Sequence, residues 1–234
     1  MQEHGIGYIV NACASIESLK DTEELMEQYP FVYGAFGIHP DDAEKMTEET
    51  LEEIRQLSRL PKAVAIGEIG LDYYWHKEEH EHEIQKKMFL AQMEIAREEK
   101  LPFMVHSRDA AKDTLDLVKD CMKGGMYGGI IHCFSYGKEM AREYLDMGLY
   151  LGIGGVVTFK NAKKLKEVVA YAPLEQLVLE TDSPYLSPEP NRGKRNSSLN
   201  LPYVAEAIAQ IKGCSEEEVI AVTEENAKKL LLRK

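Results

Sequence analysis

An α/β fold of the TIM-type, a (β/α)8 barrel, is predicted by two observations. The first is a regular alternation of short apolar segments with longer charged segments that have helical spacing. The second is that His or carboxylate residues come at the ends of four apolar segments, as they do where parallel strands end at the mouth of a barrel. Strand–helix repetition of this kind is typical of a parallel sheet with helical crossovers.

The apolar segments are rich in Val, Ile, Phe and Tyr, and they are nearly continuous in apolarity, as strands buried on both faces are. Seven of them are predicted to be strands, at Tyr8–Cys13, Val32–Ile38, Ala63–Ile69, Pro102–His106, Gly129–Phe134, Leu149–Gly154 and Gln176–Thr181. Charged segments between them predict helices, for example at Thr47–Leu60, Glu83–Glu99, Lys112–Lys123, Lys138–Met147 and Lys160–Tyr171.

The two ends of the chain depart from this alternation. Residues 184–202 are rich in Pro, Asn and Ser and predict a long loop, after which Ser215 and Glu218 predict a capping box that opens a terminal helix. Residues 1–5 look like the last turn of a helix ending at a glycine. Seven strands are one fewer than a closed barrel needs, so we expect a first strand and most of a helix upstream of residue 1. No linker is evident, and residues 1–234 are expected to form one domain.

Composition limits the possible functions. The chain of 234 residues has a net charge of −12, which argues against broad electrostatic binding of nucleic acid. A phosphate substrate bridged by metal ions remains compatible with that charge, because bound cations reverse the local field. The four cysteines are scattered, and no secretory signal or apolar run of about 18 residues occurs. These features predict a cytoplasmic protein with reduced thiols and no membrane span.

Four residues at the ends of predicted strands are candidate metal ligands: Glu68, His106, His132 and Asp182. Two His, one Glu and one Asp suit a hydrolytic site for Zn²⁺, Mn²⁺ or Mg²⁺. In such a site Glu68 would bridge two metals and the two histidines would bind one of them. Asp182 would ligate the other metal or take a proton from the attacking water. Divalent ions there would make water a strong nucleophile and stabilise the leaving oxygen.

Several short motifs occur together along nearly the whole chain. They are Gly37–Pro40, Gly67–Tyr74, Leu101-Pro102 followed by His106–Ala110, His132–Ser135, Glu180–Tyr185, Arg192–Asn196 and Glu225–Ala227. In these motifs and their order, the chain resembles the TatD family of metal-dependent deoxyribonucleases, which lies within the amidohydrolase-like barrel superfamily. Any one motif is weakly specific, and the set is highly specific.

The resemblance implies that Glu68, His106, His132 and Asp182 are metal ligands, with Glu68 bridging two divalent ions. It also implies that Asp182 and Glu68 take part in catalysis. The family's other two ligands are a His-x-His pair at the end of the first strand, and this chain has no such pair in the corresponding place. The family pattern puts that strand just upstream of a segment like residues 1–10, which agrees with the strand expected before residue 1.

Five other residues have two interpretations each. His39 would contact a substrate phosphate or serve as a hydrogen-bonded structural residue. Arg108 would clamp a phosphate bidentately or form an ion pair with a nearby acid. Asp72 would orient a metal ligand or simply occupy a turn. Arg192 and Arg195, in the only basic stretch near the predicted mouth, would contact a phosphate backbone or remain solvated.

Three hypotheses follow for function. The leading one is a divalent-metal-dependent hydrolase that cleaves phosphodiester bonds in DNA, acting on DNA ends. The second keeps the metal site but acts on a carboxyl ester or amide, such as aminoacyl-tRNA, because the same ligands do not choose phosphorus over carbon. The third is a weakly active product that lacks the first strand and dimerises through its open sheet edges. No obligatory protein partner is evident from the sequence.

Overall fold

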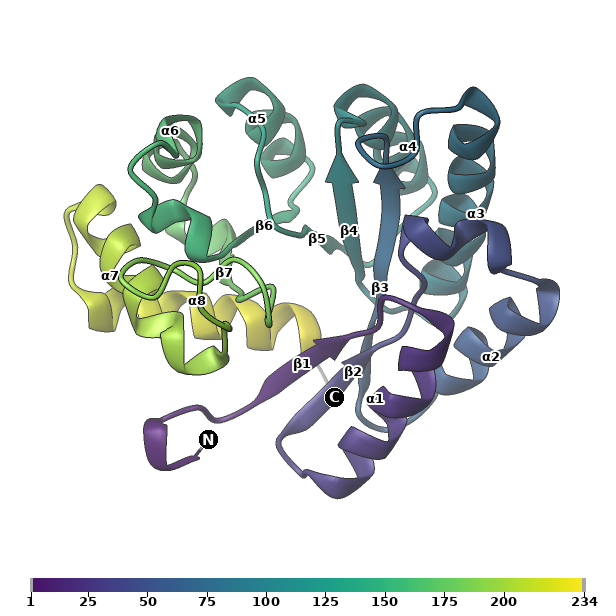
Figure 1. Ribbon diagram of the computed structural model, residues 1–234, viewed down its shortest axis with the longest axis horizontal. Coiled ribbons are helices and arrows are strands. Elements are labelled where there is room, and N and C mark those ends of the chain that lie inside the picture. The colour runs from purple at the N-terminus through teal and green to yellow at the C-terminus, as the bar shows by residue number, and fades with distance from the viewer. Residues whose placement is uncertain (1, 233–234) are drawn as a thin grey trace. The chain divides into compact units, whose positions relative to one another are not determined.

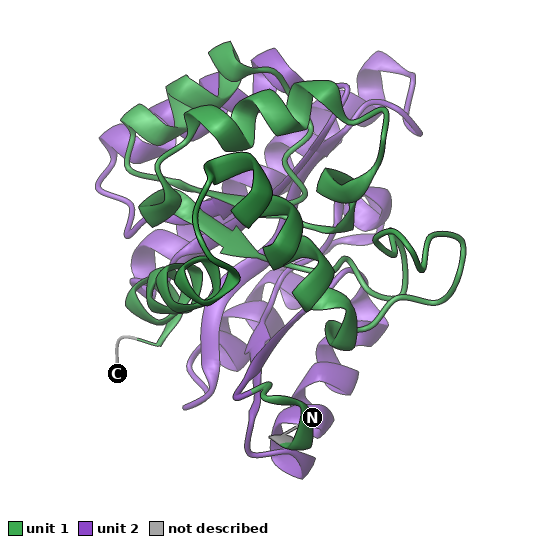
Figure 2. Ribbon diagram, turned by 90° about the vertical axis from the view of Figure 1, so that its left-hand side faces the viewer, with its two compact units in different colours: residues 1–6, 131–234 green, residues 7–130 purple. Residues whose placement is uncertain are grey.

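The computed structural model describes residues 2–232 and divides into two compact units (Figure 2). Unit 2 comprises residues 7–130, and unit 1 comprises residues 1–6 together with 131–234. Each unit alternates strands with helices, and the strand pairs within each unit are parallel. The expectation that residues 1–234 form one domain stays a prediction.

Unit 2 pairs its strands in the order in which they occur along the chain. Figure 1 shows β3 and β4 as adjacent arrows with α3 and α4 beside them. The elements are β1 (Ile9–Ala12), α1 (Ile16–Gln28), β2 (Val32–Ala35), η2 (Pro40–Lys45), α2 (Glu48–Ser58), β3 (Ala63–Asp72), α3 (Glu79–Glu98), β4 (Phe103–Arg108) and α4 (Ala111–Lys123). Strand β5 (Gly129–Ile131) spans the boundary between the units.

Burial on both faces explains why these strands read as continuous apolar runs. Every residue of β3 is buried except Glu68. In β4, Phe103 and Val105 are fully buried. Strands covered on both faces have no solvated side on which polar residues could alternate.

Polar side chains fix the helices of unit 2. Ser15 caps α1 by accepting the N–H of Ser18, 3.2 Å away. In α3, the buried Gln92 accepts the N–H of Ile38 at 2.7 Å and donates to its carbonyl at 3.1 Å. Helix α3 thereby holds the segment that follows β2, where His39 lies.

Unit 1 contains β6 and β7, which pair in parallel, and the last helices of the chain. The amide of Asn226 in α8 donates to the carbonyls of Leu174 and Leu177, each 2.8 Å away, and so anchors α8 at the start of β7. The elements are η1 (Gln2–His4), α5 (Lys138–Asp146), β6 (Tyr150–Ile153), η3 (Gly155–Thr158), α6 (Lys163–Tyr171), η4 (Leu174–Gln176), β7 (Leu177–Leu179), η5 (Ser198–Asn200), α7 (Leu201–Lys212) and α8 (Glu216–Leu231).

The seven predicted strands are confirmed, and their ends differ from the prediction. Parallel pairing continues from Ile69↔Val105 to Asp72↔Arg108, so β3 and β4 extend beyond their predicted ends. Glu68 and His106 therefore lie inside strands rather than at their last residues. Strand β5 ends at Ile131 rather than at the predicted Phe134, so His132 directly follows it, and β7 ends at Leu179, before Asp182.

The predicted helices are also confirmed, most of them with shifted starts. Helix α3 begins at Glu79 rather than Glu83. Ser215 caps α8 by accepting the N–H of Glu218 at 3.2 Å. Near the N-terminus, residues 2–4 form one 3-10 turn before Gly5, whose φ is 75°, and Met1 lies outside the described residues. Within residues 2–232, no helix combines the length and apolarity that a bilayer crossing requires.

Candidate metal-binding site

Glu68 occupies an irregularity in the middle of β3. The register of β3 against β4 shifts between Ile66 and Ile69, and Glu68 lies inside that interval. Its N–H donates to the carbonyl of Cys13 at 2.8 Å, and its side chain is 14% exposed. Because an irregular strand segment re-aims a side chain, Glu68 reaches solvent where its buried neighbours do not.

The imidazole of His106 lies between two carboxylates. Its Nδ1 is 2.9 Å from Oε1 of Glu68, and its Nε2 is 3.1 Å from Oδ2 of Asp72. Across the strand pair, Gly70 has a φ of 146°, and a Cβ on it would collide with the carbonyl of His106. A glycine is therefore needed for β3 to approach β4 closely at this position.

This arrangement favours positive charge at His106. Burial alone would lower the pKa of the imidazole, but the hydrogen bonds to Asp72 and Glu68 outweigh burial and raise that pKa to about 9. Burial would likewise raise the pKa of Asp72, and the hydrogen bond to His106 helps to turn the net effect into a lower pKa. Carboxylates placed in this way stabilise a cation, whether a proton or a metal ion.

His39 joins Glu68 and His106 in a group of potential metal ligands. Its ring lies edge-on to the ring of His106, with 4.3 Å between centroids, and its Nε2 is 4.0 Å from Oε1 of Glu68. One ligand atom from each of the three side chains lies within 4.8 Å of the others. Two imidazoles and a carboxylate suit a divalent metal ion, so this donor set fits one. The sequence predicts that His39 either contacts a substrate phosphate or is a hydrogen-bonded structural residue, and its position in the structure also allows metal ligation.

Local hydrogen bonds orient His39. Its Nδ1 lies 3.2 Å from the backbone nitrogen of Asp41 and 3.4 Å from Oδ2 of the same residue, which leaves Nε2 toward Glu68. The hydrogen bond with His39 is the largest cause that lowers the pKa of Asp41, to about 2. His76 also lies 3.1 Å from the Asp41 carboxylate.

A second histidine lies between two carboxylates in unit 1. Nδ1 of His132 is 2.8 Å from Oε2 of Glu180, and its Nε2 is 3.3 Å from Oδ1 of Asp182. A carboxylate on one nitrogen of a ligating histidine fixes the tautomer and the ring orientation. The structure thus places His132 beside Asp182 in one unit, and Glu68 beside His106 in the other. That all four bind metal ions in one centre stays a prediction.

Glu180 has no role in the prediction from sequence, although it stands in the same motif as Asp182. Its Oε1 accepts the N–H of Cys133 at 2.8 Å while Oε2 faces His132. Gly152 of β6 leaves room for this carboxylate, because a Cβ there would collide with it. The available signal is a carboxylate that directly follows the apolar run 177–179, two positions before a candidate ligand.

The backbone at Asp182 is left-handed, with a φ of 55°. Aspartate tolerates this conformation better than most residues with a Cβ. Two bonds of Asn196 hold the segment in place: its amide donates to the carbonyl of Thr181 at 2.7 Å, and its N–H donates to the carbonyl of Pro184 at 2.9 Å. The loop after β7 therefore returns to the residues that flank Asp182.

Asp72 makes contacts that match both interpretations from sequence, one with a candidate metal ligand and one within a turn. One oxygen faces His106, and the other accepts the N–H groups of Tyr74 and Trp75 at 2.9 and 3.0 Å. Its backbone is held by the buried Gln85, whose amide bonds to the N–H at 3.0 Å and to the carbonyl at 3.2 Å. Asp72 is positioned both to orient His106 and to shape the turn after β3.

The three arginines predicted to bind substrate lie in different surroundings. The guanidinium carbon of Arg108 is 4.0 Å from the centroid of the Tyr74 ring. That of Arg192 is 4.2 Å from the Phe159 ring, and Arg195 is exposed in the same loop. Contacts of these side chains with a phosphate stay predictions.

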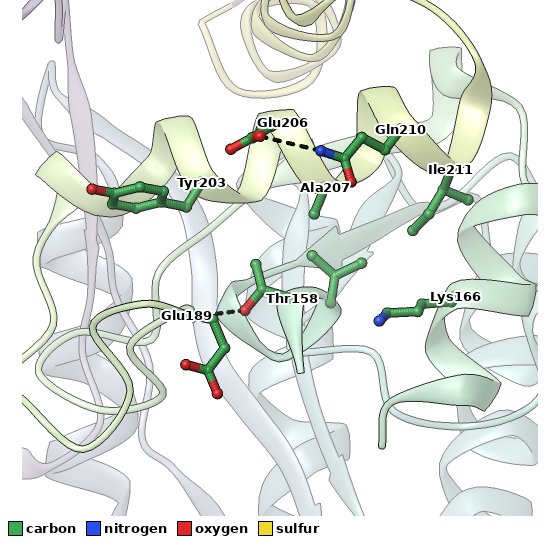
Figure 3. A pocket seen from close by; sticks show the side chains of 9 residues that line it. Thr158, Lys166, Glu189, Tyr203, Glu206, Ala207, Gln210 and Ile211 are labelled. Carbon is green, nitrogen blue, oxygen red and sulfur yellow. Dashed lines mark hydrogen bonds between the residues drawn. The ribbon is translucent and has the colours of Figure 1, made fainter. Parts of the chain in front are cut away.

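A cavity of about 240 Å³ in unit 1 lies among η3, α6 and α7 (Figure 3). At its edges, the hydroxyl of Thr158 accepts the N–H of Glu189 at 2.8 Å, and Gln210 donates to Glu206 at 3.1 Å. None of the predicted site residues lines this cavity. It is therefore separate from the residues that form the candidate metal site.

Comparison with known proteins identifies the family. A family model described as TatD related DNase matches residues 1–232. The uncharacterized metal-dependent hydrolase YabD of Bacillus subtilis is 50% identical over 208 residues, which cover 88% of this chain and 80% of YabD. The 3′-5′ ssDNA/RNA exonuclease TatD of Citrobacter rodentium is 33% identical over 232 residues, which cover 97% of this chain and 87% of that protein.

Solved structures agree with this assignment. YJJV, a TatD homologue from Escherichia coli, matches with a TM-score of 0.91 and 28% identity, covering 99% of this chain and 89% of YJJV. The predicted TIM-type barrel fold is thereby confirmed. Because the family model spans nearly the whole chain and similar proteins are named metal-dependent hydrolases, the chain belongs to the TatD family of metal-dependent hydrolases.

Proposed function

We propose that this hydrolase cleaves phosphodiester bonds in DNA and removes nucleotides from the end of a single strand. The observation that carries the proposal is the grouping of His39, Glu68 and His106, which fits a divalent ion. The substrate class is supported by relatives from Citrobacter rodentium and Salmonella typhimurium, each 33% identical and named a 3′-5′ ssDNA/RNA exonuclease. The metal ions are proposed to number two per site and to be Mg²⁺, Mn²⁺ or Zn²⁺.

Divalent ions would supply Lewis-acid chemistry, drawing electron density from the phosphodiester and acidifying water. The side chains of the protein would hold the metal ions and orient the groups that bind them. Asp72 and Glu180 keep the imidazoles of His106 and His132 in fixed orientations. Glu68 offers a carboxylate that is partly exposed inside an otherwise buried strand.

Asp182 is the proposed acceptor of the proton from the attacking water. Its side chain is 31% exposed, so water can reach its carboxylate. Its Oδ1 lies 3.3 Å from Nε2 of His132, so the two proposed metal ligands face each other. As the water oxygen bonds to phosphorus, the bond to the leaving nucleotide oxygen breaks, and that oxygen takes a proton from solvent.

The acidic surface is consistent with a substrate that is short and single-stranded. A net charge of −12 opposes long-range attraction of duplex DNA. Guanidinium groups such as that of Arg108 can instead grip individual phosphates bidentately. We therefore expect weak binding to duplex DNA and better binding to single-stranded ends.

The test begins with protein stripped of metal by EDTA. Single-stranded DNA labelled at either end, duplex DNA and single-stranded RNA are incubated with Mg²⁺, Mn²⁺ or Zn²⁺, and products are resolved by length. We expect stepwise shortening of single strands that requires added metal. Glu68→Gln and Asp182→Asn should each reduce the rate by about a hundredfold or more, as loss of charge-stabilising groups does in other enzymes.

Three results would count against the proposal. Full activity without metal, or unchanged rates in both variants, would remove the metal-centred mechanism. Hydrolysis of an aminoacyl ester with no shortening of DNA or RNA would favour the carboxyl-ester alternative, which uses the same ligands. Elemental analysis of the purified protein tests the proposed two metal ions per chain independently of substrate.

A further inference from the structure

Two large aromatic side chains are exposed directly after β3. Trp75, the only tryptophan in the sequence, is 64% exposed, and Tyr74 is 42% exposed. Their rings meet edge to face, with 4.7 Å between centroids. Single exposed hydrophobic side chains are common and need no explanation, whereas large exposed ones that lie together often mark a binding site.

Cations accompany this pair. The guanidinium of Arg108 lies 4.0 Å from the centroid of Tyr74 and 5.6 Å from that of Trp75. The ammonium of Lys77 lies 5.1 Å from the centroid of Tyr74. Positive charge and aromatic faces thus occur together on a protein whose net charge is strongly negative.

The backbone that carries the two rings is firmly held. Asp72 accepts the N–H groups of both Tyr74 and Trp75. The preceding Tyr73 stacks on His82 with 3.6 Å between centroids, and its hydroxyl donates to Asp113 at 2.9 Å. Rings presented from a rigid turn lose little conformational freedom when a ligand stacks on them.

The turn is joined directly to the candidate metal site. The carboxylate of Asp72 that holds the two N–H groups also faces Nε2 of His106, 3.1 Å away. His106 in turn faces Glu68. Arg108 lies two positions beyond His106 in β4 and pairs in register with Asp72. The two rings, the two cations and the metal-ligand candidates Glu68 and His106 therefore belong to one connected region of unit 2.

We propose that Tyr74, Trp75 and Arg108 form an aromatic platform on which a nucleobase of the single-stranded substrate stacks. This inference rests on the proposed function and adds how the substrate strand is recognised. Stacking requires no net attraction between charges and tolerates any base, because every base has a π-face. Duplex DNA keeps its bases stacked on each other, so the platform selects unpaired ends. Arg108 and Lys77 place positive charge where the adjoining phosphate would lie.

Because Trp75 is the only tryptophan in the sequence, the tryptophan fluorescence of the protein changes when a base stacks on this side chain. Metal-free protein in EDTA, which cannot hydrolyse the strand through a metal centre, is titrated with hexadeoxyadenylate while Trp75 fluorescence is recorded. The matched ligand is a hexamer of the same charge made of abasic nucleotides. We expect quenching by hexadeoxyadenylate and, with the abasic strand, little quenching and an affinity about tenfold lower.

Variants are compared by the anisotropy of labelled hexadeoxyadenylate. Trp75→Ala should weaken binding about tenfold, and Trp75→Phe should restore most of it, because Phe retains a stacking face. The control is Tyr29→Leu, which removes another exposed aromatic ring, at the end of α1. Tyr29→Leu should bind like the unmodified protein.

Equal binding of the normal and abasic strands would overturn the platform, as would unchanged affinity in Trp75→Ala or no binding at millimolar strand. A Trp75→Ala variant that binds normally but loses self-association would assign the rings to a protein contact instead. Because these measurements involve no hydrolysis, they are separable from the proposed function. Base-dependent binding in EDTA, together with no shortening of any strand when Mg²⁺, Mn²⁺ or Zn²⁺ is added, would refute the nuclease and leave the platform.

Discussion

Asp72 and His106 lie 3.1 Å apart, with the carboxylate of Asp72 on the nitrogen of His106 opposite to the one that faces Glu68. Replacing Asp72 by Asn keeps the shape and removes the charge that favours a cation. We expect Asp72→Asn to weaken metal binding about 10- to 100-fold, as loss of such partners does in other metal sites. Calorimetric titration with Mn²⁺ measures it, with exposed Asp116→Asn in α4 as the control. Equal affinities would contradict the orienting role.

Gly152 should be needed for activity because of the space it leaves for Glu180. A methyl group there would meet the Glu180 carboxylate, which would have to turn away from His132. Since the displaced group is the end of a flexible side chain, we expect the fold to persist while metal-dependent hydrolysis falls about tenfold or more. Gly7→Ala is the matched control, because a Cβ at Gly7 meets nothing within 4 Å. A fully active Gly152→Ala would show that the position of Glu180 is unimportant.

Gln92 should matter for both stability and the placement of His39. Gln92→Leu would leave the buried N–H and carbonyl of Ile38 without their side-chain partner. Each unsatisfied buried group costs about 1–3 kcal/mol, so unfolding in urea should begin at clearly lower concentration. Gln56→Leu, at an exposed position in α2, should change stability by less than about 0.5 kcal/mol. Similar midpoints for the two variants would contradict this prediction.

The ion pair of Asp113 with Lys86, at 2.8 Å, should stabilise the fold only above acidic pH. The hydrogen bond from Lys86 lowers the pKa of Asp113 below its ordinary value of 3.8. A carboxyl group whose pKa is lower in the folded than in the unfolded protein stabilises the fold at pH values above its pKa in the unfolded protein. That stabilisation is lost as pH falls through its pKa in the folded protein.

Asp113→Asn should therefore reduce stability at pH 7 by at most about 1 kcal/mol, because the pair is partly exposed. The difference from the unmodified protein should shrink as pH falls below about 4. Urea unfolding of both proteins at neutral and acidic pH measures it. A difference that stays constant with pH would mean that the Asp113 charge is not responsible.

The limits of prediction are visible in β3. Residues 63–66 are recognisable as a strand because burial on both faces requires a continuous apolar run. The extension to Asp72 is not recognisable, since Gly70 and Asp72 are residue types that strands disfavour. Only pairing with β4, which lies more than thirty positions further along the chain, keeps that segment extended.

In the candidate site, too, some residues can be predicted from sequence and others cannot. Glu68, His106 and His132 can be singled out from their residue type and their neighbours in sequence. Glu180 and Gln92 act through partners 48 and 54 positions away, His132 and Ile38, and no local pattern encodes such contacts. The stacking of Arg108 on Tyr74 is likewise a consequence of pairing between β3 and β4.

The shared carboxylate of Asp72 makes the two ends of its hydrogen-bond network mutually dependent. One oxygen is bound to the imidazole of His106, and the other holds the turn that carries Trp75. Energetic coupling between two ligands is reciprocal, so each must change the affinity for the other by the same factor. A metal ion that fixes the orientation of Asp72 should therefore raise the affinity for a nucleotide by the same factor by which the nucleotide raises the affinity for the ion. Such an enzyme would retain its metal most firmly while it is engaged with a strand.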